Sequence, residues 1–285
     1  MTSIHQHVAD ARGRLRDAGI RSAELDARLL AEFALGWNTE RFIVSGQDAA
    51  PRDFPARYDA LVGRRVAREP LAYIVGHREF WGLSLAVSPA VLIPRPETEL
   101  IVQAALDLFP DRERTLTVAD VCTGCGCVAI ALAAERPAAH IVATDISEPA
   151  LEVARQNGVS HGVADRITFL RTDLLDGVEG PFDLITCNPP YVAEVSRPGL
   201  QPEVREHEPA VALFGGADGL GIVARLVADA GRHLRSGGYL LFEFGYGQDE
   251  EVESLIAAMG GLTLLEFRRD LQGIARTAIV RREEQ

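Results

Sequence analysis

The spacing of apolar side chains predicts helices in the N-terminal part of the chain. In residues 22–36, Leu25, Leu29 and Phe33 fall on one helical face, between a serine N-cap and a glycine stop. Residues 57–70 repeat this pattern and end at a proline. No polar cluster here is typical of a reaction centre, so we expect a small helical bundle that serves as a recognition or lid domain.

From about residue 116 onward the pattern changes, because short continuous apolar runs alternate with helical segments. Continuous apolar strands between helices are typical of a mostly parallel sheet that is covered on both faces. The sequence therefore predicts an α/β fold of the Rossmann-like kind. The expected strands are residues 115–122, 140–145, 166–170, 182–187, 237–245, 263–270 and 275–282.

Between these parts, two short alternating stretches at 83–87 and 91–93 flank a Ser-Pro pair and predict a hairpin. A proline and two glutamates then indicate the start of the next helix. We expect a helical recognition domain over residues 1–80, a β-hairpin linker over 81–95, and an α/β domain over 96–285.

A glycine-rich loop follows the first expected strand of the sheet, in the segment DVCTGCGC. Gly124 and Gly126 permit close approach of a ligand, and the helix that follows offers free N–H groups. Asp145 ends the next strand, where an acid suits ribose hydroxyls. Two ligands fit this pattern. A dinucleotide fits Gly-x-Gly-x-x-Ala, and S-adenosylmethionine fits a loop preceded by an acid, here Asp120. A plain tight turn also fits the loop by itself.

The strand FDLITC ends abruptly in Asn188, Pro189, Pro190 and Tyr191. Because ligands bind beyond the carboxyl ends of parallel strands, these residues should share a crevice with the glycine loop. A side-chain amide oxygen and a proline carbonyl make two rigid acceptors for a planar NH2 group, and Tyr191 adds a flat wall. Such acceptors favour the positive charge that develops on a weakly nucleophilic nitrogen as it attacks a methyl group. The alternative is that the tetrapeptide is only a turn.

Cysteines at 122, 125, 127 and 187 raise the possibility of a zinc or iron–sulfur site. A metal there would obstruct a ligand in the glycine loop, and a ligand-binding loop requires small residues such as cysteine. We therefore predict no metal.

Composition and charge narrow the functional classes. Residues 1–96 carry a net charge of +2 and the remainder carries −14, which together give the −12 of the whole chain. An acidic α/β part argues against a stable nucleic-acid partner. The chain has no apolar run long enough to span a membrane and no signal-peptide pattern, so a cytoplasmic location is expected.

The motifs DVCTGCGC, VATD and NPPY, in this order, resemble class I S-adenosylmethionine-dependent methyltransferases that act on amide or exocyclic nitrogens. The stretch REPLAYIVGHREFWGLSLAVSPAVLIPRPETE, with EPAVALFGGADGL and RRDLQGIART, resembles the release factor glutamine methyltransferases of HemK/PrmC type. This resemblance implies a seven-stranded methyltransferase domain. It also implies that S-adenosyl-L-methionine methylates the glutamine of the Gly-Gly-Gln motif in peptide-chain release factors.

The resemblance also implies roles for individual residues. The segment Arg95–Glu99 would close over the cofactor. Cys122 stands where the family usually has glycine, and Leu174 stands where some relatives carry an aromatic residue. The implied cofactor-binding residues are Cys122, Thr123, Gly124, Cys125, Gly126, Asp145, Asp173, Leu174 and Asn188. The implied catalytic residues are Asn188, Pro189 and Tyr191, and the implied substrate-binding residues are Asn188, Pro189, Pro190 and Tyr191.

Three other functional classes were weighed against this interpretation. A nucleic-acid adenine-N6 methyltransferase shares the tetrapeptide but requires a basic groove. A non-catalytic protein on a decayed methyltransferase fold is disfavoured by the intact Asn188, Asp145 and loop glycines. A nicotinamide-dependent dehydrogenase leaves the Asn-Pro-Pro-Tyr segment unexplained.

Overall fold

The computed structural model describes residues 2–284 and separates into two compact units. One unit contains the residues up to 77 together with 201–207, and the other contains 78–200 and the residues from 208 onward. Each unit is considered by itself. The predicted domain boundaries at residues 80 and 95 stay a prediction.

The helical unit is built around a single apolar core. Ser3 caps the first helix, since its hydroxyl accepts from the backbone of Gln6 while the Gln6 side chain accepts from the backbone of Ser3. Tyr58 donates from the core to the carbonyl of Ala27 at 2.8 Å, which satisfies its buried hydroxyl. The helices are α1 (Ile4–Asp17), α2 (Ala23–Leu35), α3 (Thr39–Ser45), α4 (Phe54–Val66), α5 (Leu71–Val75) and α9 (Pro202–His207).

Helix α2 confirms the helix predicted near residues 22–36, but its buried face is not the expected one. Leu25 and Phe33 are 47% and 43% exposed. The core is instead contacted by small residues and Leu30, which lets neighbouring helices approach closely. The prediction that the stripe of Leu25 and Phe33 faces the core is therefore wrong.

A buried ion network joins α9 to the helices around it. Arg65 is only 6% exposed and lies 2.7 Å from a carboxylate oxygen of Asp26 and 3.0 Å from one of Glu203. Arg68 reaches the second oxygen of Glu203 at 2.6 Å. Because each buried charge has a partner, the network holds the segment 201–207 within this unit.

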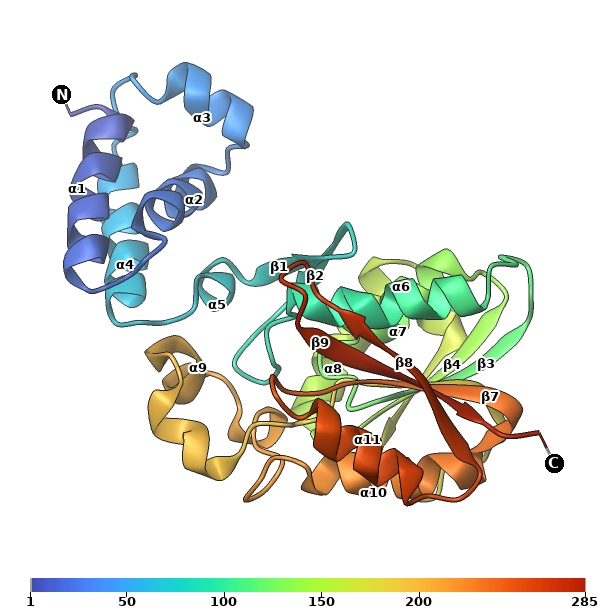
Figure 1. The fold of residues 1–285 in the computed structure, drawn as a ribbon. Coiled ribbons are helices and arrows are strands. Elements are labelled where there is room, and N and C mark those ends of the chain that lie inside the picture. The colour runs from blue at the N-terminus through green and yellow to red at the C-terminus, as the bar shows by residue number, and fades with distance from the viewer. Residues whose placement is uncertain (1, 285) are drawn as a thin grey trace. The chain divides into compact units, whose positions relative to one another are not determined.

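The second unit contains a seven-stranded sheet in the order β5-β4-β3-β6-β7-β9-β8 (Figure 1). The first five strands of that order pair in parallel, and β9 pairs antiparallel with β7 and with β8. This arrangement confirms the predicted class I methyltransferase fold. The strands are β3 (Leu116–Val121), β4 (Ala139–Asp145), β5 (Ile167–Arg171), β6 (Phe182–Cys187), β7 (Leu234–Glu243), β8 (Leu262–Arg269) and β9 (Ala275–Arg282).

Helices cover both faces of this sheet, with α6 on one side and α10 and α11 on the other (Figure 1). Strand β6 is buried along its whole length, as its continuous apolar run predicts. The helices are α6 (Glu99–Leu108), α7 (Cys127–Glu135), α8 (Glu148–Ser160), α10 (Gly221–His233) and α11 (Asp249–Ala257). Short 3₁₀ turns lie at η1 (Pro96–Thr98), η2 (Ala164–Arg166), η3 (Glu194–Gly199) and η4 (Ala210–Ala212).

The predicted hairpin exists, but its position was wrong. It consists of β1 (His77–Phe80) and β2 (Leu83–Ala86), joined by Trp81 and Gly82, which both have positive φ (53° and 71°). Two such residues make the tight turn that suits the twist of a hairpin.

The second expected strand, at 91–93, is a loop. The N–H of Val91 donates to Ser88 within the loop, and the N–H of Ile93 donates to the carboxylate of Glu208. Neither donor is therefore available to a partner strand. Prolines at 89 and 94 supply no N–H at all.

Candidate active site

A cavity of about 1120 Å³, counting the solvent at its mouth, lies at the carboxyl ends of the central parallel strands of the second unit. This is where an open α/β sheet binds its ligands. Sequence-predicted residues supply much of its wall. Those that line it are Cys122, Thr123, Gly124, Cys125, Asp145, Asp173, Leu174, Asn188 and Pro190.

Three predicted residues are absent from the lining, although each lies next to residues that form it. Gly126 lies behind the loop, whereas Pro189 is buried and Tyr191 points its hydroxyl toward Glu243. Of the tetrapeptide, Asn188 and Pro190 therefore line the cavity, whereas Pro189 and Tyr191 lie next to the lining residues.

The glycine loop has the shape that a close ligand requires. Gly124 has φ +56°, and a Cβ built on it would meet no atom within 4 Å, so the loop is open on that side. Gly126 has φ +85°, and a Cβ there would lie 2.9 Å from Ile130 and 3.2 Å from Ala154. The first glycine therefore keeps space at the cavity, while the second is required for packing.

Cys122 begins this loop in a left-handed conformation, with φ +56°. Such a conformation favours glycine and costs roughly 1–2 kcal/mol for other residues. The backbone therefore accommodates Cys122, where the resemblance implies glycine, at this cost in free energy. The side chain of Cys122 is half-buried and contributes to the cavity wall.

Asp145 holds the glycine loop through its carboxylate. One oxygen accepts from the N–H of Gly124 at 2.9 Å, and the other accepts from the N–H of Ser147 at 2.9 Å. Burial raises the pKa of this carboxyl above its ordinary value, while hydrogen bonds from backbone N–H groups oppose the shift. The same carboxylate lines the cavity and has lone pairs left for a ligand.

Asp120 is a second buried acid, at the end of β3. It accepts from the hydroxyl of Thr123 at 2.6 Å and from that of Thr186 at 2.7 Å. Complete burial raises its pKa to about 6, because the charged form loses its hydration.

Another part of the cavity wall is formed by Asp173 and Leu174. Asp173 lies 2.8 Å from Arg225 in a half-exposed ion pair, and all three residues line the cavity. Leu174 has φ +51°, and its carbonyl accepts from the buried hydroxyl of Thr144 at 2.9 Å. This bond holds the turn in an unusual conformation for leucine.

Asn188 is held by residues that the sequence analysis did not connect with it. Its amide NH2 donates to the hydroxyl of Thr98 at 3.0 Å, and that hydroxyl donates to Glu243 at 2.6 Å. Tyr191 donates to the other oxygen of Glu243 at 2.7 Å. The amide oxygen of Asn188 is buried and has no hydrogen-bond partner among the described residues.

Glu243 itself is 1% exposed at the end of β7. Burial raises its pKa, and the hydrogen bonds from Thr98 and Tyr191 oppose that shift. Its only signal in the sequence is an acid inside the apolar run YLLFEF, which indicates a buried charge with a specific partner. Sequence reasoning missed it because nothing in the run indicates which residues it contacts.

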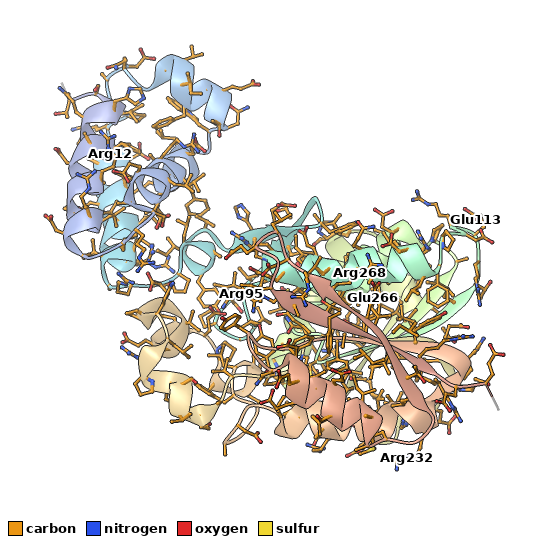
Figure 2. The ribbon with its side chains drawn as sticks, viewed as in Figure 1. Arg12, Arg95, Glu113, Arg232, Glu266 and Arg268 are labelled. Atoms are coloured by element: carbon orange, nitrogen blue, oxygen red, sulfur yellow. The ribbon has the colours of Figure 1, made fainter. Side chains whose placement is uncertain are left out.

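The loop before η1 also contributes to the cavity, through Val91, Pro94 and Thr98. It is fastened by Glu208, which accepts from the guanidinium of Arg95 at 2.5 Å (Arg95 is labelled in Figure 2) and from the N–H of Ile93 at 3.1 Å. Of residues 95–99, Thr98 lines the cavity. That this segment closes over the cofactor stays a prediction.

All four cysteines are free thiols. The thiol of Cys125 raises the pKa of the Cys127 thiol, and burial raises that of Cys187. Across residues 2–284, no group of three or more His, Cys, Asp or Glu side chains could hold a metal ion.

Solved structures with similar folds agree with this architecture. A methyltransferase from Pyrococcus furiosus superposes with a TM-score of 0.53 at 16% identity and covers 81% of this chain and 100% of that one. The T. thermophilus 16S rRNA N2 G1207 methyltransferase (RsmC), in complex with AdoMet and guanosine, superposes with a TM-score of 0.52 at 18% identity. It covers 73% of this chain and 50% of that one. These likenesses show that the second unit has the fold of class I methyltransferases.

Sequence comparisons identify the family. A family model described as "PrmC N-terminal domain" matches residues 6–76, and one described as "Methyltransferase small domain" matches 98–200. The release factor glutamine methyltransferase of Bradyrhizobium diazoefficiens is 42% identical over 271 residues, covering 94% of this chain and 91% of that relative. That of Cereibacter sphaeroides is 43% identical over 260 residues, with 91% of each covered. The chain belongs to the release factor glutamine methyltransferase family.

Proposed function

We propose that this protein transfers a methyl group from S-adenosylmethionine to the side-chain nitrogen of the glutamine in the Gly-Gly-Gln motif of peptide-chain release factors. Family membership supports this activity. The observation that carries it is the buried amide oxygen of Asn188, which has no partner among residues 2–284. A buried acceptor without a partner costs free energy, so its retention beside a cavity points to a ligand that donates.

The cavity wall suggests how the cofactor would be held. Asp145 would accept from ribose hydroxyls through its remaining lone pairs, and the loop residues 122–126 would contact the methionine part. Asp173 and Leu174 would contact the adenine. The residues present fit this ligand, because the space next to Gly124 is open and the acids beside it favour a cationic sulfonium.

The tetrapeptide would hold the second reactant. The amide oxygen of Asn188 and the backbone carbonyl of Pro189 would each accept one hydrogen of the carboxamide NH2. Pro190 and Tyr191 would complete the wall around it. Two fixed acceptors stabilise positive charge on nitrogen, which is commonly worth a factor of about 10²–10³ per group.

The bound cofactor supplies an electrophilic methyl group on a sulfonium. The protein contributes orientation and electrostatics rather than a general base before attack. The methylated nitrogen becomes acidic as it gains charge, so its proton can leave afterwards.

The test is to incubate the protein with labelled S-adenosylmethionine and a release factor, and then with the variant in which alanine replaces the glutamine of Gly-Gly-Gln. We expect label on the first protein and none on the second. Label on both would contradict the proposed target, and label on neither would contradict the activity.

Adenine-N6 methylation of nucleic acid is the alternative, since such enzymes share the tetrapeptide. An oligonucleotide in the same assay addresses it, and the names of the relatives favour glutamine. No helix within the described residues is long and apolar enough to cross a membrane. A cytoplasmic location stays a prediction from the sequence.

A further inference from the structure

We propose that Glu243 and Thr98 are positioning residues that fix the orientation of the Asn188 side-chain amide and thereby make the site select a carboxamide over a carboxylate. This inference rests on the proposed function. It assigns roles to two buried side chains that never need to touch the substrate.

The three residues come from segments that the fold brings together. Asn188 follows β6, and Glu243 ends β7, the parallel neighbour of β6. Thr98 ends the 3₁₀ turn before α6 and supplies the hydroxyl between them. Thr98 and Glu243 are each 1% exposed, so solvent cannot substitute for either partner.

The direction of each hydrogen bond follows from counting protons. The hydroxyls of Thr98 and Tyr191 each donate to one carboxylate oxygen of Glu243. Thr98 has a single hydroxyl proton, which is used at 2.6 Å on Glu243, and its oxygen can therefore only accept. Asn188 must turn its NH2 toward Thr98, which leaves its amide oxygen on the opposite side.

This orientation determines which side chain the site accepts. An amide oxygen without a partner attracts the NH2 hydrogens of a glutamine. It repels the oxygens of a glutamate, which has the same shape but no donor when ionised. A site that leaves a buried polar group unpaired rejects the wrong ligand strongly, so orientation of one amide is enough to discriminate.

Glu243 also holds the other end of the tetrapeptide. Its second oxygen accepts from Tyr191 at 2.7 Å, so one carboxylate is bonded to that residue and, through Thr98, to Asn188. The backbone carbonyl of Tyr191 is held separately by the side chain of Gln248 at 3.1 Å. The turn is thus fixed at both ends, and within the described residues the Asn188 amide is oriented through its hydrogen bond to Thr98, which is bonded to Glu243.

The decisive variant is Thr98→Val, which keeps the shape of the side chain and removes the hydroxyl. We expect kcat for the release factor to fall about 10- to 100-fold, the effect of a slightly misplaced reacting group. Affinity for S-adenosylmethionine should stay within about twofold by calorimetry. Thr98→Ser, which restores the hydroxyl, should recover most of the rate.

Thr277→Val is the matched control. Thr277 is another fully buried threonine on the neighbouring strand β9, and its hydroxyl has no partner among residues 2–284. This variant should behave as wild type. A loss equal to that of Thr98→Val would show that any buried change in this region reduces the rate, and would overturn the inference.

The second measurement is inhibition by a release factor whose Gly-Gly-Gln reads Gly-Gly-Glu. Wild type should bind this competitor at least tenfold more weakly than the glutamine protein. Thr98→Val should reduce this ratio of affinities, because the Asn188 amide is then free to rotate and can present its NH2 to the glutamate. Glu243→Gln should also reduce it and provides the same test if Thr98→Val does not fold. An unchanged ratio in the folded variants overturns the inference, as does a Thr98→Ser variant as impaired as Thr98→Val. Absence of transfer by wild type would instead refute the proposed function.

Discussion

Replacing Asp145 by asparagine is the most direct perturbation of the cofactor side of the cavity. A carboxylate offers about four lone-pair sites, and the N–H groups of Gly124 and Ser147 occupy one on each oxygen, both at 2.9 Å. Two sites are therefore left for the ribose hydroxyls that we propose it binds. Asparagine has one oxygen, so it can keep at most one backbone bond together with one ligand bond.

The magnitude follows from the bonds that are lost. A hydrogen bond to a charged group contributes about 1.5–3 kcal/mol, so the loss of one ribose contact should raise the Kd for S-adenosylmethionine about 10- to 150-fold. The loss of one backbone bond should also lower the free energy of unfolding, by up to about 3 kcal/mol. Isothermal titration calorimetry measures the first effect, and denaturant unfolding without ligand measures the second.

The control is Asp176→Asn, which makes the same change of charge at an exposed residue outside the cavity. Both quantities should be unchanged in this variant. If Asp145→Asn lowers the free energy of unfolding but binds S-adenosylmethionine with wild-type affinity, the carboxylate only organises the loop. The proposed ribose contact would then be wrong.

Other variants separate further roles of the structure. Gly126→Ala should cost about 1–3 kcal/mol of unfolding free energy, because its Cβ would lie 2.9 Å from a neighbouring side chain. Gly124→Ala should instead mainly weaken cofactor binding. If both variants lost the same amount of stability, the different roles of the two glycines would be contradicted. Burial raises the pKa of the Asp120 carboxyl from 3.8 to about 6. Its contribution to the free energy of unfolding, up to about 3 kcal/mol, is therefore fully present below pH 4 and is lost as the pH rises through 6. Denaturant unfolding from pH 4 to 7 should show a smaller decline for Asp120→Asn, and an identical decline would refute the assignment. Arg65→Met should destabilise the helical unit by about 3–5 kcal/mol, because the buried carboxylate of Asp26 loses its charged partner and Glu203 keeps only Arg68. Unaltered unfolding would show that the network contributes nothing.

The order of strands and helices in the second unit could be predicted because each strand is a continuous apolar run. The run FDLITC gave the bounds of β6, since all six of its residues are buried. The hairpin was misplaced for a local reason. Its turn requires positive φ at Trp81, a residue type that does not indicate such a turn, whereas the Ser-Pro pair that does indicate one lies within a loop.

Burial in the helical unit was predicted less well. A stripe of large apolar residues on α2 predicts a core face that includes Leu25 and Phe33, but these two residues are exposed and alanines occupy the interior. The period of the apolar residues predicts that a helix forms, but it does not predict which side of the helix a neighbouring element covers. When small residues allow close helix packing, the large ones can remain on the surface.

In the site, too, residues marked by the local sequence could be predicted, whereas contacts between distant residues could not. Gly124, Asp145 and Asn188 were predicted because each follows a strand whose end lies at one edge of the sheet. Thr98 and Glu243 could not be paired from the sequence, since 145 residues separate them and only the fold joins them.

Asp120 and Glu243, two buried acids of this site, have the same hydrogen-bond arrangement. This arrangement explains how the site can hold buried carboxylates without disturbing a neutral substrate. Asp120 and Glu243 each accept from two hydroxyl groups. A hydroxyl that donates to a carboxylate keeps only lone pairs for its other neighbours, so these groups can accept but not donate. Their negative charge still favours a sulfonium through the low-dielectric interior. Hydroxyls that donate to these carboxylates thus act as hydrogen-bond acceptors toward the cavity. Such acceptors suit both a cationic methyl donor and the NH2 of a carboxamide.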